Sequence, residues 1–234
     1  SSMTWTDRFT LFSSLDFAGL AFVIISWAIV GWFIENPPTH RPSVSMLMGQ
    51  YRREWMVQMT TRQPRIFDAQ IIGSLRQGTA FFASTSMLAI GGTLALVGNG
   101  EELSGFANEL TLGQDPAFVW EVKLMAIALF LTNAFLKFVW SNRLFGYTAV
   151  LVAATPNDTT DPLCLPRARQ AAEIGISAAR GFNRGLRSLY FALATAAWIA
   201  GAVPLIVATL FTIGVLYRRE FASQSRLILI DPPS

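Results

Sequence analysis

Enzymes and metalloproteins rely most often on histidine and cysteine, and this sequence contains one of each, His40 and Cys164. A single cysteine cannot form an internal disulfide. Structural zinc needs about four Cys or His ligands, and a bis-histidine haem needs two histidines. His40 lies in the proline-rich segment 37–42, which is typical of an exposed turn rather than of a catalytic site. The sequence therefore predicts no enzyme activity, no metal and no cofactor.

Motifs for phosphate or nucleic-acid binding are also missing from the sequence. No GxxxxGK[ST] motif occurs, and Gly98 and Gly100 are followed by Glu101 and Glu102, which would repel a phosphate. The net charge of +3 and the pI near 9.4 are not accompanied by a basic run with interleaved aromatic residues. The sequence therefore predicts neither a nucleotide cofactor nor a nucleic-acid partner.

Polar residues inside an otherwise apolar segment in the middle of the chain are the best candidates for chemistry. Asn133, Lys137 and Ser141 recur at intervals of four and would share one face of a helix. Lys123 lies about four turns earlier near the same side, and Glu121 lies at that end of the segment. Because hydrocarbon makes such groups expensive, a polar stripe in a membrane span is a candidate site for the passage of ions or solutes.

Two interpretations of the lysines are open. Their long side chains could run along the apolar zone and place the ammonium groups near lipid headgroups. Alternatively, Lys137 faces the interior of a bundle and pairs with Asp16 or Glu35. Glu35 is the better candidate, because it ends the first apolar segment on the same side. Asn133 lies further from either end, and its amide is expected to form a hydrogen bond with another helix.

The elements that would position these residues are membrane-spanning helices. Only 14% of the residues are charged and 52% are hydrophobic, whereas soluble domains carry about 25% charged residues. Three windows without charge, 17–34, 77–100 and 188–217, are long enough for the roughly 20 residues of a membrane-spanning helix. With the segment of the polar stripe, the sequence predicts an all-α integral membrane protein with four transmembrane helices in a bundle. The chain would form a single membrane domain, 1–234, with spans at about 15–35, 77–99, 117–141 and 188–217.

The positions of the basic residues predict the orientation of the spans. Segments 35–76 and 142–187 hold six arginines each, whereas segment 101–116 holds none and carries four acidic residues. Cytoplasmic loops are enriched in Lys and Arg, so we expect these two segments inside and both termini outside. The membrane would be a plasma membrane, which is the inner membrane in a bacterium. Arg218 and Arg219, directly after the last window, are the main evidence against this arrangement.

Both inner segments are predicted to contain amphipathic helices, at about 43–75 and 165–187. In the first, five apolar residues recur at spacings of three and four between Pro42 and Pro64. This helix could lie on the inner leaflet or pack against the second inner segment, because an apolar face does not specify its partner. The five residues are Val44, Met48, Tyr51, Trp55 and Met59.

The second inner segment carries a basic face. Its arginines, together with Glu173, fall on one helical stripe, and Arg169 and Glu173 can pair at i,i+4. This face is either a solvated, lipid-facing surface or an anion-binding vestibule formed by several copies of the chain. The arginines are Arg169, Arg180, Arg184 and Arg187.

Small residues on two of the spans indicate close helix packing. Gly91 and Gly92 accompany a repeat of small residues on the second span, and Gly201 follows a similar repeat on the last. Small faces let helices approach closely in lipid, so we expect self-association or binding to another membrane protein. Pro204 would free a backbone carbonyl and is predicted to kink the last span.

Several groups of residues resemble a known family. On them the chain is similar to the bacterial and plant membrane proteins catalogued as domain of unknown function 599, from the first span to the last. The resemblance implies a four-span architecture and no activity, because that family carries no established chemistry. The residues that carry it are Arg52-Arg53-Glu54-Trp55, Asp68-Ala69-Gln70 with Leu75-Arg76, Phe82-Ala83-Ser84, and the run from Lys137 to Arg143.

Two functions fit these observations. We expect an oligomeric conduit, channel-like or transporter-like, for small ions or solutes, which would use the polar stripe and the basic inner face. The alternative is a non-catalytic accessory or scaffolding subunit that binds another membrane protein through its small-residue faces. The expected partners are the lipid bilayer and either further copies of the chain or a second membrane protein.

Overall fold

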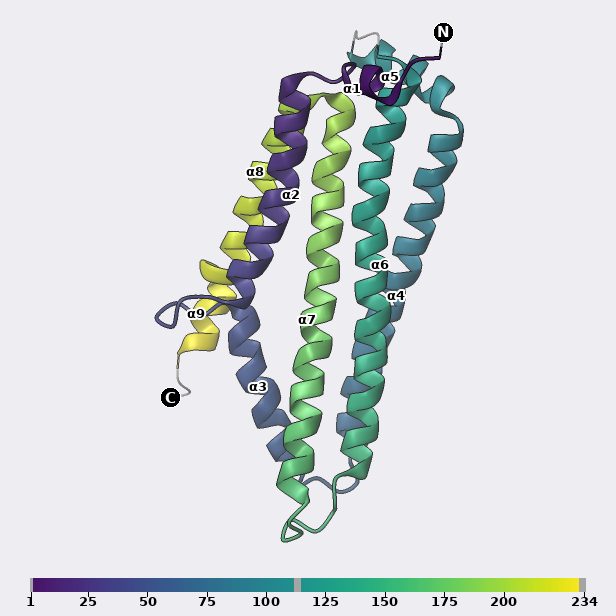
Figure 1. The fold of residues 1–234 in the computed structure, drawn as a ribbon. Helices are drawn as coiled ribbons and strands as arrows, with labels where there is room; N and C mark the ends of the chain where they lie inside the picture. Colours follow the sequence, from purple (N-terminus) through teal and green to yellow (C-terminus); the bar gives the residue numbers. More distant parts are fainter. Residues whose placement is uncertain (1, 112–114, 232–234) are drawn as a thin grey trace. The chain divides into compact units, whose positions relative to one another are not determined.

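The computed structural model contains helices and no strand within the residues that it describes, 2–111 and 115–231, which confirms the all-α prediction (Figure 1). A short 3-10 helix, η1, separates two of the α-helices. The elements in chain order are α1 (Trp5–Phe9), α2 (Ser14–Glu35), α3 (Val44–Met59), α4 (Ile66–Gly98), α5 (Gly100–Thr111), α6 (Ala117–Ala154), α7 (Cys164–Ala196), η1 (Ala197–Ala200), α8 (Ala202–Phe221) and α9 (Gln224–Ile230).

Four helical segments are long and apolar enough to cross a membrane. α2 follows its predicted span closely, whereas α4 begins well before position 77 and α6 continues well past position 141. Charged residues limit how much of a helix lipid can bury, but they do not end the helix. α4 begins just after Pro64 and α6 ends just before Pro156, because proline restricts the backbone on both sides. The four segments are Ser14–Glu35, Ile66–Gly98, Ala117–Ala154 and Ala202–Ile230, the last of which includes α9.

The last predicted span, 188–217, is not one helix. α7 ends inside this window, η1 follows, and Gly201 adopts a φ of 128° before α8 begins. Glycine reaches positive φ at little cost, so the uncharged window contains a break between two helices. Pro204 lies in the first turn of α8, where a backbone N–H would have no helical acceptor. The predicted window is therefore interrupted at Gly201, whereas Pro204, the predicted site of the kink, lies at the start of a helix and does not kink one.

Contacts divide the chain into two compact units. Unit 1 comprises residues 1–32, 86–134 and 187–217, and unit 2 comprises residues 33–85, 135–186 and 218–234. The long helices α2, α4, α6, α7 and α8 contribute residues to both units. The candidate residues are divided accordingly: unit 1 holds Glu121, Lys123, Asn133 and Arg187, and unit 2 holds Lys137, Ser141, Arg169, Arg180 and Arg184.

In unit 1, α7 runs antiparallel to α2. The Trp198 indole, just after the end of α7, bonds to Asp16 near the start of α2. Arg187 lies beside Gly31 near the end of α2, with its Nε 3.5 Å from the position that a Cβ on Gly31 would take. The chain then turns at Gly201, and α8 returns beside α7 in the opposite direction. The two helices line a groove formed by Tyr190, Leu193, Ala194, Ala208, Phe211, Thr212, Val215 and Leu216.

One face of the part of α7 in unit 1 is buried by its neighbours, whereas Leu193 on another face is 71% exposed. Ser188, Phe191 and Thr195 are each 0% exposed. A helix face that packs against protein can carry small and polar residues. α7 is not among the four apolar segments because its part in unit 2 carries several charged residues.

In unit 2, the end of α3 packs into an apolar core. Met56 and Met59 are 1% and 0% exposed, whereas Met48 and Tyr51 of the predicted apolar face are 37% and 39% exposed. The C-terminal end of α3 thus packs against the second inner segment, as one of the two alternatives predicted. The predicted helical segment 43–75 is divided into α3 and the first turns of α4. The core consists of Met56, Met59, Ile72, Leu144, Phe145, Val152, Ala168, Ala171, Ala172 and Ala178.

Candidate functional site

Lys123 of α6 is buried in unit 1. The residue is 3% exposed, and its Nζ lies 4.6 Å from the ring centroid of Trp120 and 5.6 Å from that of Trp198. Both tryptophans are themselves 1% exposed. An ammonium group is attracted to the face of an indole ring by about 2 kcal/mol where water is excluded. Within the described residues, Lys123 is thus enclosed by two tryptophans rather than extended along the outer surface of α6.

Asp16 is the acidic group beside this lysine. Its carboxylate accepts a 2.9 Å hydrogen bond from Trp198 Nε1 and bonds of 3.0 Å from the backbone N and Oγ of Ser13, and it interacts electrostatically with Lys123. Trp198 thus contacts both charges, one through its N–H and the other through its ring face. The Trp120 Nε1 is buried without a hydrogen-bond partner among the described residues. We call Asp16, Trp120, Lys123 and Trp198 the Lys123 cluster.

The sequence identifies Lys123 as a candidate but not the residues around it. Asp16 is suggested there only as a partner for Lys137, and Trp198 is one residue of the uncharged window 188–217. Asp16 and Trp198 are 182 positions apart, so no local spacing connects them. The one indication in the sequence is the residue type of Trp198. A buried indole N–H usually needs a hydrogen-bond acceptor, so a polar partner for Trp198 could be expected.

Asn133 joins α6 to α7 in unit 1, as the sequence predicts. Its Nδ2 donates to Ser188 Oγ at 3.1 Å, and that hydroxyl donates to the Phe130 carbonyl at 2.6 Å. Ser188 is 0% exposed, so its hydroxyl is satisfied entirely by these two partners. The amide of Asn133 therefore serves a helix–helix contact.

Replacing Ser188 with alanine is expected to destabilise the protein by about 1 kcal/mol, because the Asn133 amide loses its acceptor in a buried position. Thermal unfolding in detergent, followed by circular dichroism, measures the change. Ser84→Ala is the matched control, since Ser84 is exposed on α4. Equal effects of the two substitutions would contradict a stabilising role for the Asn133–Ser188 bond.

Ser141 and Lys137 lie at the contact of α6 with α7 in unit 2. Ser141 is 0% exposed, and its hydroxyl donates to the Ala178 carbonyl at 2.6 Å. The Lys137 carbonyl lies 3.7 Å from the position that a Cβ on Gly181 would take, and the Lys137 residue is partly exposed. Ser141 of the polar stripe therefore bonds to α7, and the backbone at Lys137 lies close to the same helix.

Glu35, the expected partner of Lys137, is bound by Arg184 instead. The Arg184 Nε and Nη2 donate to the two carboxylate oxygens of Glu35 at 2.7 and 2.8 Å. A guanidinium presents two parallel N–H groups that match a carboxylate, whereas an ammonium is a single point charge. These hydrogen bonds raise the pKa of Arg184.

The four arginines of the predicted basic face have different surroundings. Arg187 is 6% exposed in unit 1, and Arg184 binds Glu35 in unit 2. Arg169 and Arg180 are exposed. A uniform basic surface would require all four side chains to have the same environment. These four do not.

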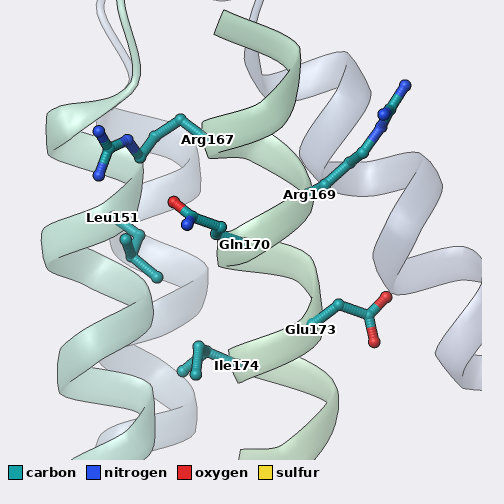
Figure 2. Close-up of a pocket in the computed structure, with 6 residues that line it drawn as sticks. All are labelled: Leu151, Arg167, Arg169, Gln170, Glu173 and Ile174. Carbon is teal, nitrogen blue, oxygen red and sulfur yellow. The ribbon is translucent and has the colours of Figure 1, made fainter. Parts of the chain in front are cut away.

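Glu173 pairs with another helix rather than along its own. Its oxygens accept bonds of 2.7 and 3.3 Å from Arg53 of α3, and this hydrogen bonding lowers the pKa of Glu173. Figure 2 shows Arg169 directed away from Glu173, so the predicted i,i+4 pair is replaced by the pair with Arg53. The side chains of Arg53 and Glu173 are 48% and 57% exposed, and such pairs contribute less than about 1 kcal/mol.

A shallow groove of about 530 Å³ lies between α6 and α7 in unit 2 (Figure 2). Leu151 and Ile174 face each other across it, and Arg167 and Gln170 lie on the same side of α7. This lining offers apolar contact and hydrogen-bond donors but no nucleophile with an adjacent base. The residues around the groove are Leu151, Arg167, Arg169, Gln170, Glu173 and Ile174.

Glu121, Gly91 and Gly92 lie outside the Lys123 cluster. The Glu121 Oε1 lies 2.8 Å from the position of a Cβ on Gly100, so the first turn of α5 lies directly against this carboxylate. Gly91 and Gly92 are exposed, and no atom lies within 4 Å of the position of a Cβ on either. The predicted packing role of these two glycines therefore corresponds to no contact within the described chain.

Groups suited to metal binding do not converge in the described residues. No set of three or more His, Cys, Asp or Glu side chains there could hold a metal ion. Cys164 is buried with its Sγ 3.6 Å from the Pro156 carbonyl, and His40 is exposed.

The fold and these contacts define an all-helical protein with apolar helices long enough to cross a membrane. The family model of DUF599, described as a protein of unknown function, matches residues 18–225, and the chain belongs to this family. The resemblance inferred from the sequence motifs is thus confirmed. Comparison with curated proteins and with solved structures gives no significant match.

Proposed function

We propose that this protein is a channel-like or transporter-like conduit for small ions or solutes, with its pathway in unit 1. The observation that carries the proposal is the burial of two cationic residues there, Lys123 at 3% and Arg187 at 6% exposure. A cation inside a membrane costs about 3 kcal/mol or more, so such residues most often serve ion or solute pathways. Because these side chains are cationic, although Asp16 lies beside Lys123, small anions are the solutes that we propose.

A flux measurement in liposomes tests this proposal. The purified protein is expected to release chloride faster than empty liposomes do. Lys123→Gln and Arg187→Gln are each expected to slow the release about tenfold or more, because each removes a buried charge. Lys123→Arg keeps the charge and is expected to retain more of the rate than Lys123→Gln.

The matched control for the flux measurement is Arg180→Gln, which removes an exposed charge from the same helix as Arg187. Its rate is expected to equal that of the unmodified protein. Circular dichroism and size-exclusion chromatography identify variants that have not folded. The proposal fails if the unmodified protein adds no flux, or if folded Lys123→Gln and Arg187→Gln variants both keep the full rate.

We further infer that five helices cross the membrane, with the N-terminus outside and the C-terminus in the cytoplasm. The proposal is supported by the antiparallel packing of α7 against α2 and the return of α8 after Gly201, which is the arrangement expected if α7 also crosses. Arg218, Arg219 and Arg226 then join eleven of the twelve arginines of the two inner segments, the twelfth being the buried Arg187, and Arg8 is the basic residue that remains outside the spans on the other side. This arrangement satisfies the positive-inside rule better than the predicted outer C-terminus.

Reporter fusions test this orientation in a bacterial inner membrane. Green fluorescent protein fused to the C-terminus is expected to fluoresce, because it folds in the cytoplasm. Alkaline phosphatase at the same position is expected to be inactive. A fluorescent protein that does not fluoresce, together with an active phosphatase, would show that the C-terminus lies outside and would contradict this orientation.

An accessory or scaffolding subunit is a second candidate, favoured by the exposed surface of α4. Only 11% of the apolar window of α4 is buried, and Gly91 and Gly92 lie on this helix with open space around them. Purification in mild detergent distinguishes the two functions. Several copies of this chain alone would support the predicted oligomeric conduit, whereas a second protein at constant ratio would support the scaffold. Gly91→Leu is expected to disrupt whichever assembly uses this surface.

A further inference from the structure

The C-terminal helix α9 presents an apolar surface in unit 2. Leu227, Ile228 and Ile230 are 63%, 67% and 44% exposed. Three large aliphatic side chains so exposed on a helix of 7 residues would be unfavourable in water. This surface therefore needs a covering partner.

Specific contacts hold α9 with this surface outward. Arg226 is 9% exposed, and its Nε donates to the Pro42 carbonyl at 2.9 Å. The Tyr51 hydroxyl of α3 donates to the Leu229 carbonyl at 3.0 Å. The Ser223 side chain caps the first turn by accepting from the Arg226 backbone N–H. The exposure of the aliphatic residues is thus a consequence of a fixed orientation and not of a loose chain end.

The exposed surface continues onto α3. Tyr51, which binds α9, is 39% exposed, and Met48 on the same face one turn earlier is 37% exposed. Arg218 and Arg219 are exposed in the last turn of α8. An apolar surface with nearby basic groups matches the boundary between acyl chains and anionic headgroups. We call Leu227, Ile228, Ile230, Tyr51 and Met48 the α9 surface.

The connection between α8 and α9 determines which partner is within reach. Only Ala222 and Ser223 separate α9 from α8, a helix that belongs to an apolar segment long enough to cross a membrane. Two linking residues span no more than about 10 Å between the ends of the helices. A helix tied so closely to the end of a membrane span lies at the membrane surface.

We propose that the α9 surface is inserted in the bilayer, at the boundary between headgroups and acyl chains, and anchors unit 2 there. If the C-terminus is cytoplasmic, as proposed above, this boundary belongs to the inner leaflet. The contact with lipid itself does not depend on that orientation. The partner is therefore the lipid surface itself and not a second protein.

Quenching by spin-labelled lipids tests the proposal. In the full chain with Cys164→Ala, single cysteines from Leu227→Cys, Ile228→Cys and the control Asp158→Cys carry an environment-sensitive fluorophore. Asp158 is exposed in the connection between α6 and α7. Vesicles of phosphatidylcholine and phosphatidylglycerol contain lipids with a nitroxide near the headgroup. Quenching at 227 and 228 is expected to exceed that at 158 at least about twofold.

Two results would overturn the lipid contact. Equal, weak quenching with water-like emission at all three positions would mean that the surface is in water. Apolar emission without quenching at 227 and 228 would mean that a protein covers it. Chloride flux measured in the same vesicles separates this proposal from the proposed function, because lost quenching with intact flux refutes only the anchor.

Discussion

Replacing Gly185 with alanine is expected to destabilise the protein by about 2 kcal/mol, although alanine is the better helix former. A Cβ at this position would lie 2.5, 2.7 and 2.9 Å from three ring carbons of Phe138. The ring has little room to move, because Phe138 is 0% exposed and its centroid lies 5.5 Å from that of Phe82 and 5.6 Å from that of Phe182. Thermal unfolding in detergent measures the loss.

Gly175→Ala on the same helix is the matched control. Its added Cβ would meet the Thr148 side chain at 3.7 Å, an ordinary contact distance. This variant gains helix propensity without a clash and is expected to be neutral or more stable by up to about 1 kcal/mol. The double variant with Phe138→Leu should also recover part of the Gly185→Ala loss, since the two side chains share the same space. Shifts of the same sign and size for Gly175→Ala and Gly185→Ala would refute the packing account.

The helices of this protein are largely predictable from the sequence, because hydropathy and helix boundaries are local properties. α2 follows its uncharged window, and α3 begins after Pro42 and ends before Pro64 as predicted. The error in the last span also had a local signal. A window of 30 residues is longer than one crossing requires, and it contains Gly201 and Pro204, which together commonly separate two helices.

The surroundings of the candidate residues were predictable only in part. An amide in an apolar helix needs a hydrogen-bond partner, so a bond from Asn133 to another helix could be predicted from the residue type alone. That the partner is Ser188 could not be predicted from the sequence. Lys123 and Lys137 have the same side chain on the same helix, yet one is buried and the other is partly exposed. That difference depends on which helices surround each turn of α6, and those neighbours come from distant parts of the chain.

Replacing Asp68 with alanine is expected to lower the free energy of unfolding by about 3 kcal/mol, which is the second large effect. The Asp68 side chain is 0% exposed and accepts hydrogen bonds from Trp55 Nε1 at 2.8 Å and from Arg62 Nη2 and Nε at 2.7 and 3.1 Å. These bonds connect the end of α3, the following turn and the first turn of α4. Removing the carboxylate leaves the half-buried indole N–H of Trp55 and the half-buried guanidinium of Arg62 without their acceptor. Chemical unfolding in detergent measures the loss.

Glu173→Gln provides the comparison that distinguishes burial from charge pairing. It also breaks a carboxylate–arginine pair in unit 2, with the same shortest distance of 2.7 Å, but its carboxylate is 57% exposed rather than 0%. Water can replace the lost partner there, so the expected change is below about 1 kcal/mol. Adding Arg62→Met to Asp68→Ala should restore part of the stability, because it removes the charge left without a partner. Equal losses for Asp68→Ala and Glu173→Gln would mean that burial does not determine the strength of the Asp68 contacts.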